Sequence, residues 1–335
     1  MRGARPLAPA AAAAPSVPYV PPRWLPGGHA QTIYASRLRV ALPPLRRERV
    51  ETADADFWDF DWLDPAPGND APLIVLFHGL EGSARSHYAR ALLALLHERG
   101  QGGVVPHFRG CGGEPNRLAR AYHSGDHEEI GALLAAVRAR VAPSRALVAF
   151  GVSLGGSALL NWLGRAGSTG PDVVQAAAAV SAPIDLTAAG RAIGEGLNRI
   201  YTMHFLTSLK PKSLEVAARF PGALDARRIR GVRTMYAFDD AVTAPLHGFA
   251  GADDYWHRAS SMPWLRHVRV PTLVLNARND PFIPAASLPT ARDVAPAVVL
   301  EQPADGGHAG FPAGPFPGHV GWLPRRLLHF VDSGR

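Results

Sequence analysis

From residue 72 onward, short apolar runs of strand length alternate with longer segments in which apolar residues recur at helical spacing. The short runs are apolar on both sides, which is typical of strands buried between two layers of helices. We predict core strands at 73–77, 146–150, 176–180, 270–275 and 297–300, a further short strand that begins at 104–105, and helices at 86–99, 130–141, 154–163 and 322–331. This alternation indicates a mostly parallel, doubly wound α/β sheet.

Three parts of the chain break this rhythm. The Pro- and Gly-rich segment 22–33 predicts turns, and 46–51 with 57–63 predicts an edge hairpin, its second strand alternating aromatic and acidic residues. Residues 184–265 carry helical patterns and no convincing core strand. An insertion at this point lies over the strand ends, so we expect a helical cap there.

This pattern divides the chain into four parts: a flexible Pro/Ala-rich arm (1–22), a first part of the core (23–183), the helical cap (184–265) and a second part of the core (266–335). The arm holds five consecutive alanines between two prolines, which is too short and too poor in leucine for a secretory signal. No run approaches the roughly 18 apolar residues of a membrane span. We therefore expect a cytoplasmic protein without an integral membrane segment.

The composition of the chain limits the kinds of partner that the protein is expected to bind. The net charge of +7 is almost all arginine, with Lys210 and Lys212 as the only lysines, and the densest basic runs are short. Nucleic-acid binding usually requires a concentrated basic stripe with interleaved aromatic residues, so we do not expect this protein to bind nucleic acid. Peripheral contact with anionic lipid stays open. Cys111 is the only cysteine, which excludes an intrachain disulfide and a thiolate metal cluster.

The segment Gly151-Val-Ser153-Leu-Gly155 lies between a predicted strand and a predicted helix. In that context G-x-S-x-G indicates a sharp turn that presents the serine hydroxyl at the N-terminus of the helix, with small residues where the backbone passes closely. Ser153 is therefore the candidate nucleophile, and the α/β-hydrolase fold, with an inserted cap, is the predicted architecture.

A serine hydroxyl needs a histidine to take its proton and an acid to orient that histidine. Asp280 and His308 follow two successive late strands, in the order serine, acid, histidine that is usual for this fold. Both positions lie at strand C-terminal ends, where ligands bind in open α/β sheets. Asp305 is too close to His308 in sequence to serve as the separate acid.

Acyl transfer also needs hydrogen-bond donors for the oxyanion that forms on the carbonyl. In this fold one donor is the backbone N–H after the nucleophile, here Leu154, and the other comes from the loop after the first core strand, most plausibly Leu80. Motifs for a zincin metal site, a dinucleotide fingerprint and a phosphate loop all fail, so we expect no cofactor and no metal.

Several motifs together resemble the YheT-like hydrolases, the AB hydrolase 4 group of the AB hydrolase superfamily, which is related to plant embryogenesis-associated EMB8-like proteins. The matching segments are Pro26-Gly-Gly-His-Ala-Gln-Thr32, His78-Gly-Leu-Glu-Gly-Ser83, Arg109-Gly-Cys-Gly-Gly-Glu-Pro-Asn116, Ala121-Tyr-His-Ser-Gly125, Gly151-Val-Ser-Leu-Gly-Gly156, Asn276-Ala-Arg-Asn-Asp-Pro-Phe282 and Gly306-Gly-His308. The resemblance implies a carboxylic-ester hydrolase, of short-chain esters or acylglycerols, with the triad named above. Asn279 departs from it, because relatives often carry aspartate there.

The Arg109 segment admits two interpretations: Arg109 pairs with a carboxylate and braces the site, which we favour, or it contacts substrate. Cys111 is expected to be a packed residue rather than a reactive thiol.

The sequence thus predicts a serine esterase acting on a small ester or lipid-like acyl substrate through an acyl-enzyme. Two alternatives stay open: an acyltransferase with the same triad, and a non-catalytic binding protein of the same fold. The oligomeric state is not determined by these patterns.

Overall fold

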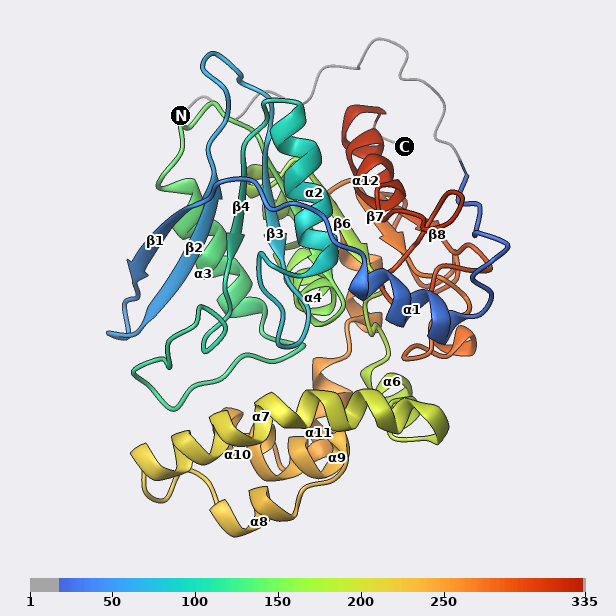
Figure 1. Cartoon of the computed structure of the whole chain (residues 1–335). Helices are drawn as coiled ribbons and strands as arrows, with labels where there is room; N and C mark the ends of the chain where they lie inside the picture. The colour runs from blue at the N-terminus through green and yellow to red at the C-terminus, as the bar shows by residue number, and fades with distance from the viewer. Residues whose placement is uncertain (1–17, 334–335) are drawn as a thin grey trace.

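The computed structural model describes residues 18–333, and Figure 1 shows its arrangement. Most of the arm predicted for 1–22 lies outside the described residues. Of its last residues, Tyr19 packs edge-on against Phe311 and Trp322, and its hydroxyl donates a hydrogen bond to the carbonyl of Pro312.

An eight-stranded sheet forms the centre of the molecule, in the order β1-β2-β4-β3-β5-β6-β7-β8. The two pairings that involve β2 are antiparallel, and the remaining neighbours are parallel. The strands are β1 (Arg46–Glu51), β2 (Phe57–Leu63), β3 (Leu73–Phe77), β4 (Gly103–Pro106), β5 (Leu147–Val152), β6 (Ala176–Val180), β7 (Thr272–Leu275) and β8 (Val298–Glu301). The predicted mostly parallel, doubly wound sheet is confirmed.

Alternate strand residues face opposite layers of helices, as the pleat requires. On one face, strand residues such as Val75 and Ala149 pack with α3 (His127–Arg138) and α4 (Leu154–Ala166). On the other, Ile74 and Val148 pack with α2 (His87–Glu98) and α12 (Trp322–Ser333). Two short helical elements follow α4: η1 (Gly167–Thr169) and α5 (Gly170–Val173). The burial of both faces explains why these strands are apolar throughout.

Strand β2 departs from simple alternation, because its acidic residues are buried as well. Asp59 and Asp61 pair with Arg49 and Arg47 of the neighbouring edge strand at 2.9 and 2.7 Å. The arginines cover this face of the hairpin, so the carboxylates are removed from water with their charge compensated.

The segment 22–33, predicted to consist of turns, instead contains the start of helix α1 (Gly28–Arg37). The prediction gave too much weight to Pro26 and the two glycines, which stand just before and at the helix start. From His29 onward the residues are compatible with a helix, and α1 packs against the loops that follow β7 and β8, which include the short helix η5 (Ala285–Ser287).

Between β6 and β7 the chain forms a helical layer over the strand ends, at the end of the molecule opposite α12 (Figure 1). Its elements are α6 (Leu186–Ala192), η2 (Gly196–Asn198), α7 (Arg199–Arg219), α8 (Ala226–Gly231), α9 (Met235–Phe238), the π-helix η3 (Asp239–Thr243), α10 (Ala244–His247), α11 (Ala252–Ala259) and η4 (Met262–His267). Here we call this layer the cap. It has its own apolar cluster, which includes Leu206, Leu209, Ile229 and Phe238.

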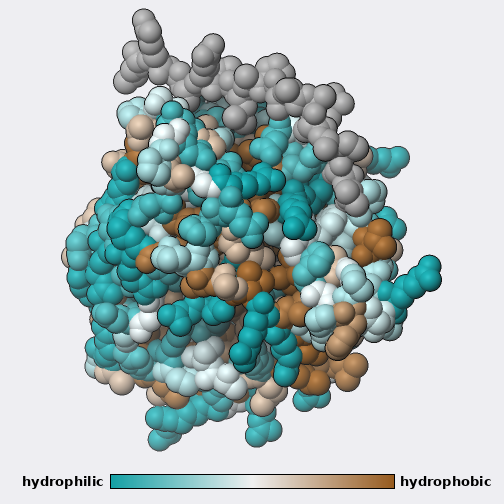
Figure 2. Space-filling view, turned by 45° about the horizontal axis from the view of Figure 1, so that its top comes forward, coloured by the Kyte–Doolittle hydropathy of each residue, from teal (hydrophilic) through white to brown (hydrophobic). Residues whose placement is uncertain are grey.

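The face shown in Figure 2 is largely hydrophilic, with hydrophobic residues gathered toward its middle and lower right. Within residues 18–333, no helix combines the length and the apolar character needed to cross a membrane.

Candidate active site

Ser153 occupies a strained turn between β5 and α4. Its backbone has φ 54° and ψ −122°, a region that residues with a side chain rarely adopt. The turn closes tightly because Gly151 and Gly155 lack side chains: a Cβ on Gly151 would stand 2.6 Å from the carbonyl oxygen of Gly155. Strain held at such a position by the surrounding packing is typical of functional sites.

The structure brings Asp280 and His308 together with Ser153, although they come from three separate loops. The Nε2 atom of His308 lies 2.9 Å from Ser153 Oγ, and its Nδ1 atom lies 2.8 Å from Asp280 Oδ2. Asp280 is only 5% exposed, and its other oxygen accepts a hydrogen bond from the backbone N–H of Phe282. An imidazole whose Nδ1–H donates to a carboxylate leaves Nε2 free to accept the serine proton.

The loop after β3 is fixed by the buried side chain of His78. Its Nε2 accepts a hydrogen bond from the backbone N–H of Phe108, so the ring proton must sit on Nδ1, which donates to the carbonyl oxygen of Gly79 at 2.8 Å. Burial lowers the pKa of His78 to about 3, so the ring is neutral around pH 7. Since a peptide unit is planar and trans, holding the Gly79 oxygen also sets the direction of the Leu80 N–H.

Leu154, the first residue of α4, lies close to this loop because Gly155 has no side chain. A Cβ on Gly155 would stand 2.4 Å from the carbonyl oxygen of His78, and one on Gly79 would stand 3.1 Å from the Cβ of Ser153. Among the described residues, neither Leu80 N–H nor Leu154 N–H donates to a backbone or side-chain acceptor. Both residues line the same cavity as Ser153.

The neighbouring residue Glu81 joins this loop to the cap. It has a left-handed backbone, with φ 55°. Its N–H donates to the hydroxyl of Tyr122 at 2.7 Å, and that hydroxyl donates back to its carboxylate at 3.0 Å. The second carboxylate oxygen pairs with Lys212 of α7 at 2.7 Å. Two separate elements, the loop that carries Tyr122 and helix α7, therefore determine where Glu81, and with it the loop after β3, is placed.

Helix α1 holds the histidine loop, a role that sequence reasoning missed. The hydroxyl of Thr32 accepts the backbone N–H of His308 at 2.8 Å and donates to the carbonyl of Gly28 at 2.7 Å. Gln31, which is fully buried, accepts the N–H of Gly306 at 2.8 Å. The only sequence signal was the family-like segment ending at Thr32, because nothing local connects residues separated by about 275 positions.

Asn279, the departure from the family pattern, takes part in the same contacts. Its amide donates to Asp305 at 2.7 Å and to Gln31 at 3.0 Å, and its oxygen accepts the N–H of Gly307 at 3.0 Å. It thus ties the loop that carries Asp280 to the loop that carries His308. An amide can donate and accept in one place, which a carboxylate cannot do when it is ionised.

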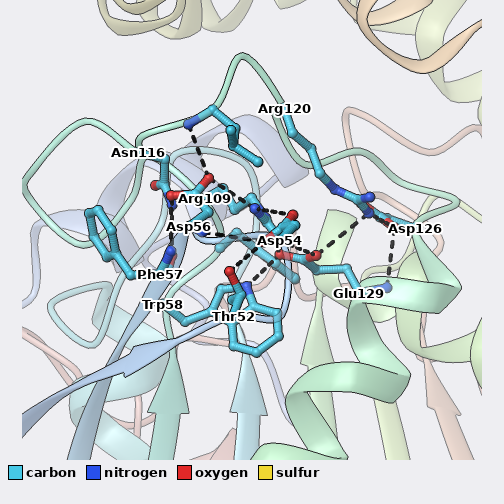
Figure 3. A network of polar contacts seen from close by, with 12 residues as sticks. Thr52, Asp54, Asp56, Phe57, Trp58, Arg109, Asn116, Arg120, Asp126 and Glu129 are labelled. Atoms are coloured by element: carbon cyan, nitrogen blue, oxygen red, sulfur yellow. Dashed lines mark hydrogen bonds and ion pairs between the residues drawn. The ribbon is translucent and has the colours of Figure 1, made fainter.

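A second polar network lies under the loop that follows β4 (Figure 3). Arg109, 6% exposed, pairs with Glu129 at 3.0 Å, with Asp56 at 2.9 Å and with Asp54 at 3.0 Å. Asn116 donates to Asp56 and to the carbonyl of Phe57, and Glu129 also accepts the indole N–H of Trp58. With its guanidinium engaged by three carboxylates, Arg109 has the contacts of a bracing residue.

A cavity of about 510 Å³ extends from Ser153 and His308 into the cap. Most of its wall is apolar, including Leu186, Ile193, Phe205, Leu209, Met235, Phe238, Val242 and Phe282. Cys111 also lines it, and burial raises the pKa of its thiol to about 12, so the thiol is protonated at neutral pH. A concave, mainly apolar site with a few convergent polar groups is typical of small-molecule binding.

The described part of the chain contains no cluster of three or more His, Cys, Asp or Glu side chains arranged to hold a metal ion.

Comparison with known proteins identifies the family. Residues 72–315 match the family model described as the alpha/beta hydrolase fold. Among solved structures, the esterase Pf2001 of Pyrococcus furiosus superposes with a TM-score of 0.53 at 15% identity, over 88% of this chain and 96% of that one. The chain therefore belongs to the α/β-hydrolase family.

Within that family the chain is similar to YheT of Escherichia coli (strain K12), whose name assigns it provisionally as an esterase. The two are 38% identical over 325 residues, covering 95% of this chain and 94% of YheT. The human phospholipase ABHD3 is 30% identical over 326 residues, covering 94% of this chain and 78% of that protein. The resemblance to YheT-like hydrolases is confirmed, and the chain is a hydrolase of this group.

Proposed function

We propose that this hydrolase is a serine carboxylic-ester hydrolase with Ser153, His308 and Asp280 as its catalytic triad. The observation that carries the proposal is the continuous chain of contacts, 2.9 Å from Ser153 Oγ to His308 Nε2 and 2.8 Å from His308 Nδ1 to Asp280 Oδ2, on the wall of an apolar cavity.

In the proposed reaction Ser153 Oγ attacks the acyl carbonyl carbon while His308 Nε2 takes its proton. The carbonyl oxygen becomes an oxyanion, which the N–H groups of Leu80 and Leu154 stabilise. His308 then gives the proton to the departing alcohol, leaving Ser153 acylated. Water, deprotonated by His308, attacks the acyl-enzyme and releases the acid and the free serine.

The cavity supports an acyl substrate with an apolar chain. Phe205, Leu209 and Phe238 of the cap line it beyond the serine, so an alkyl chain directed into the cap would leave water. Because one relative is named a phospholipase, acyl lipids belong among the substrates to be tested alongside small esters.

Aryl esters of increasing acyl length test the proposal, with hydrolysis followed for wild type and Ser153→Ala. We expect Ser153→Ala to lose activity by a factor of about 10⁴ or more, because loss of a triad member leaves only the binding site and the oxyanion donors. A fluorophosphonate probe should label wild type and spare the variant.

Ser36→Ala, which removes an exposed hydroxyl of α1, is the matched control and should behave as wild type. Hydrolysis that persists in pure Ser153→Ala protein would reject the assignment. Competing alcohol acceptors in the same assay reveal any transfer in place of hydrolysis.

A further inference from the structure

The outer face of the cap carries a row of exposed apolar side chains. Leu197, Ile200 and Met203 are 66, 63 and 58% exposed. Scattered apolar side chains are normal on a protein surface. These three recur every third residue from η2 into α7, so they form one continuous stripe, which we call the α7 stripe.

Positive charge is concentrated in the segment of the cap that contains this stripe. Residues 191–233 hold nine Lys and Arg but only three Asp and Glu, a net charge of +6 within a chain whose net charge is +7. Lys210 of α7 donates to the carbonyls of Arg230 and Val232, which places the end of α8 beside α7. Arg227 and Arg230, on α8, are exposed. Outside residues 191–233 the chain is almost neutral in net charge.

The stripe also lies directly outside the cavity wall. On the inner side of the same helix, Tyr201 and Phe205 pack on Phe282 with ring centroids 4.6 and 6.3 Å apart, and Phe282 lies 4.2 Å from the ring of His308. Asn198, next to Leu197, donates to the carbonyl of Pro281. In Figure 1, α8 lies at the end of the cap farthest from the sheet, and α7 runs along the side of the cap nearest the sheet.

We propose that this face docks onto an anionic lipid surface, with the α7 stripe inserted among the headgroups and the arginines of α8 facing the lipid phosphates. An apolar strip bordered by cations is the arrangement that binds a helix in the plane of a membrane interface. Uncharged lipid would bury the apolar stripe but would leave the cations without a counter-charge. An acidic polymer would pair with the cations but would leave the stripe exposed to water. Docking in this orientation brings the cavity wall against the bilayer.

Vesicle flotation of the full-length protein tests this. The vesicles are pure phosphatidylcholine in one set and phosphatidylcholine mixed with phosphatidylglycerol in the other. We expect binding to the mixed vesicles that weakens as salt is raised. Ile200→Ser/Met203→Ser should weaken it about tenfold or more through lost apolar burial, and Arg227→Gln/Arg230→Gln about fivefold per arginine.

Val20→Ser removes an equally exposed apolar side chain from the extended segment that precedes α1, and should bind as wild type. Ser153→Ala should also bind normally, so loss of docking and loss of the proposed catalysis are separate outcomes. The Ile200/Met203 variant should still hydrolyse a soluble short ester, because neither residue lines the cavity.

Two results would overturn the proposal. One is that the protein does not bind anionic vesicles, or that both double variants bind them as well as wild type does. The other is a dimer, seen by light scattering, that Ile200→Ser/Met203→Ser dissociates, because a second copy would then cover the stripe.

Discussion

Several individual residues hold conformations or charge states that they would not adopt in water. Ser153 and Glu81 have positive φ. The N–H of Ser153 donates to the carbonyl of Val180 in β6, and Tyr122 and Lys212 hold Glu81. His78 is held neutral by burial and is fixed as one tautomer by two backbone groups. Because the surroundings impose these states, substitutions at such residues should change chemistry or pH response more than shape.

Asp239 of the cap lines the cavity, and burial raises the pKa of its carboxyl to about 6, although Thr243 and Trp256 donate to it at 2.7 and 2.8 Å. The folded state therefore holds the proton more tightly than the unfolded state, and the associated stability is present at low pH and is lost as pH rises through about 6. We expect wild type to lose roughly 1 kcal/mol relative to Asp239→Asn between pH 5 and pH 8.

Urea unfolding at both pH values measures this difference, with Asp172→Asn, a change at an exposed carboxylate, as the control. If the Asp239→Asn and wild-type curves ran parallel, Asp239 would have to be ionised across the whole range.

At the scale of elements, α7 connects three parts of the molecule. Its inner side lines the cavity, its outer side carries the stripe, and Lys212 reaches the loop that holds Leu80. The position of the cap is therefore coupled to the position of a proposed oxyanion donor. In this arrangement a helix that covers the substrate also adjusts the groups that react with it.

Breaking that contact with Lys212→Met should lower kcat about tenfold, because oxyanion stabilisation depends on the placement of the N–H groups. The free energy of unfolding should change by less than about 1 kcal/mol, since Lys212 is half exposed and such pairs contribute little. Steady-state kinetics and thermal melting measure the two quantities.

Lys212→Arg should restore most of the rate. Lys210→Met, which removes the other lysine of α7 and its contacts with α8, should leave kcat unchanged. Equal losses in the two methionine variants would mean that α7 acts only through the stability of the cap.

At the scale of the whole molecule, the loops that carry Asp280 and His308 are held by a helix from the beginning of the described chain. Helix α1 packs so tightly on the loop of Asp280 that a Cβ on Gly28 would overlap the carbonyl of Asn279, at 1.8 Å. Gln31 and Thr32 then hold the backbone on both sides of Gly307. The orientation of His308 thus depends on a segment nearly the whole chain length away.

Thr32→Val keeps the shape of the side chain and removes the acceptor for the His308 N–H. We expect kcat to fall roughly ten- to a hundredfold with KM little changed, because the imidazole loses its fixed placement. The free energy of unfolding should fall by about 1 to 3 kcal/mol, the cost of a buried N–H without a partner. Kinetics and urea unfolding check both.

Thr169→Val, which removes an exposed hydroxyl that donates to the carbonyl of Ala166 at the end of α4, is the control. An unchanged kcat in Thr32→Val would show that the His308 loop holds its place without α1.

The sequence by itself determined the sheet and the residues proposed for the chemistry. Strands 73–77 and 176–180 have the bounds of β3 and β6, because a strand buried on both faces must be apolar throughout. The first glycine of the Gly-x-Ser-x-Gly turn is equally local, because a Cβ on Gly151 would clash with the backbone of Gly155. Such features can be predicted from residues that are neighbours in the sequence.

Only the tertiary structure decided which residues hold the site through contacts between distant parts of the chain. Gln31, Thr32 and Lys212 were not assigned roles, because an ordinary polar side chain becomes significant only when a distant backbone group or carboxylate meets it. The bracing contacts of Arg109 and the outward stripe of α7 depend in the same way on which elements pack together. Local sequence encodes turns and burial, whereas hydrogen-bond partners across the chain exist only once it has folded.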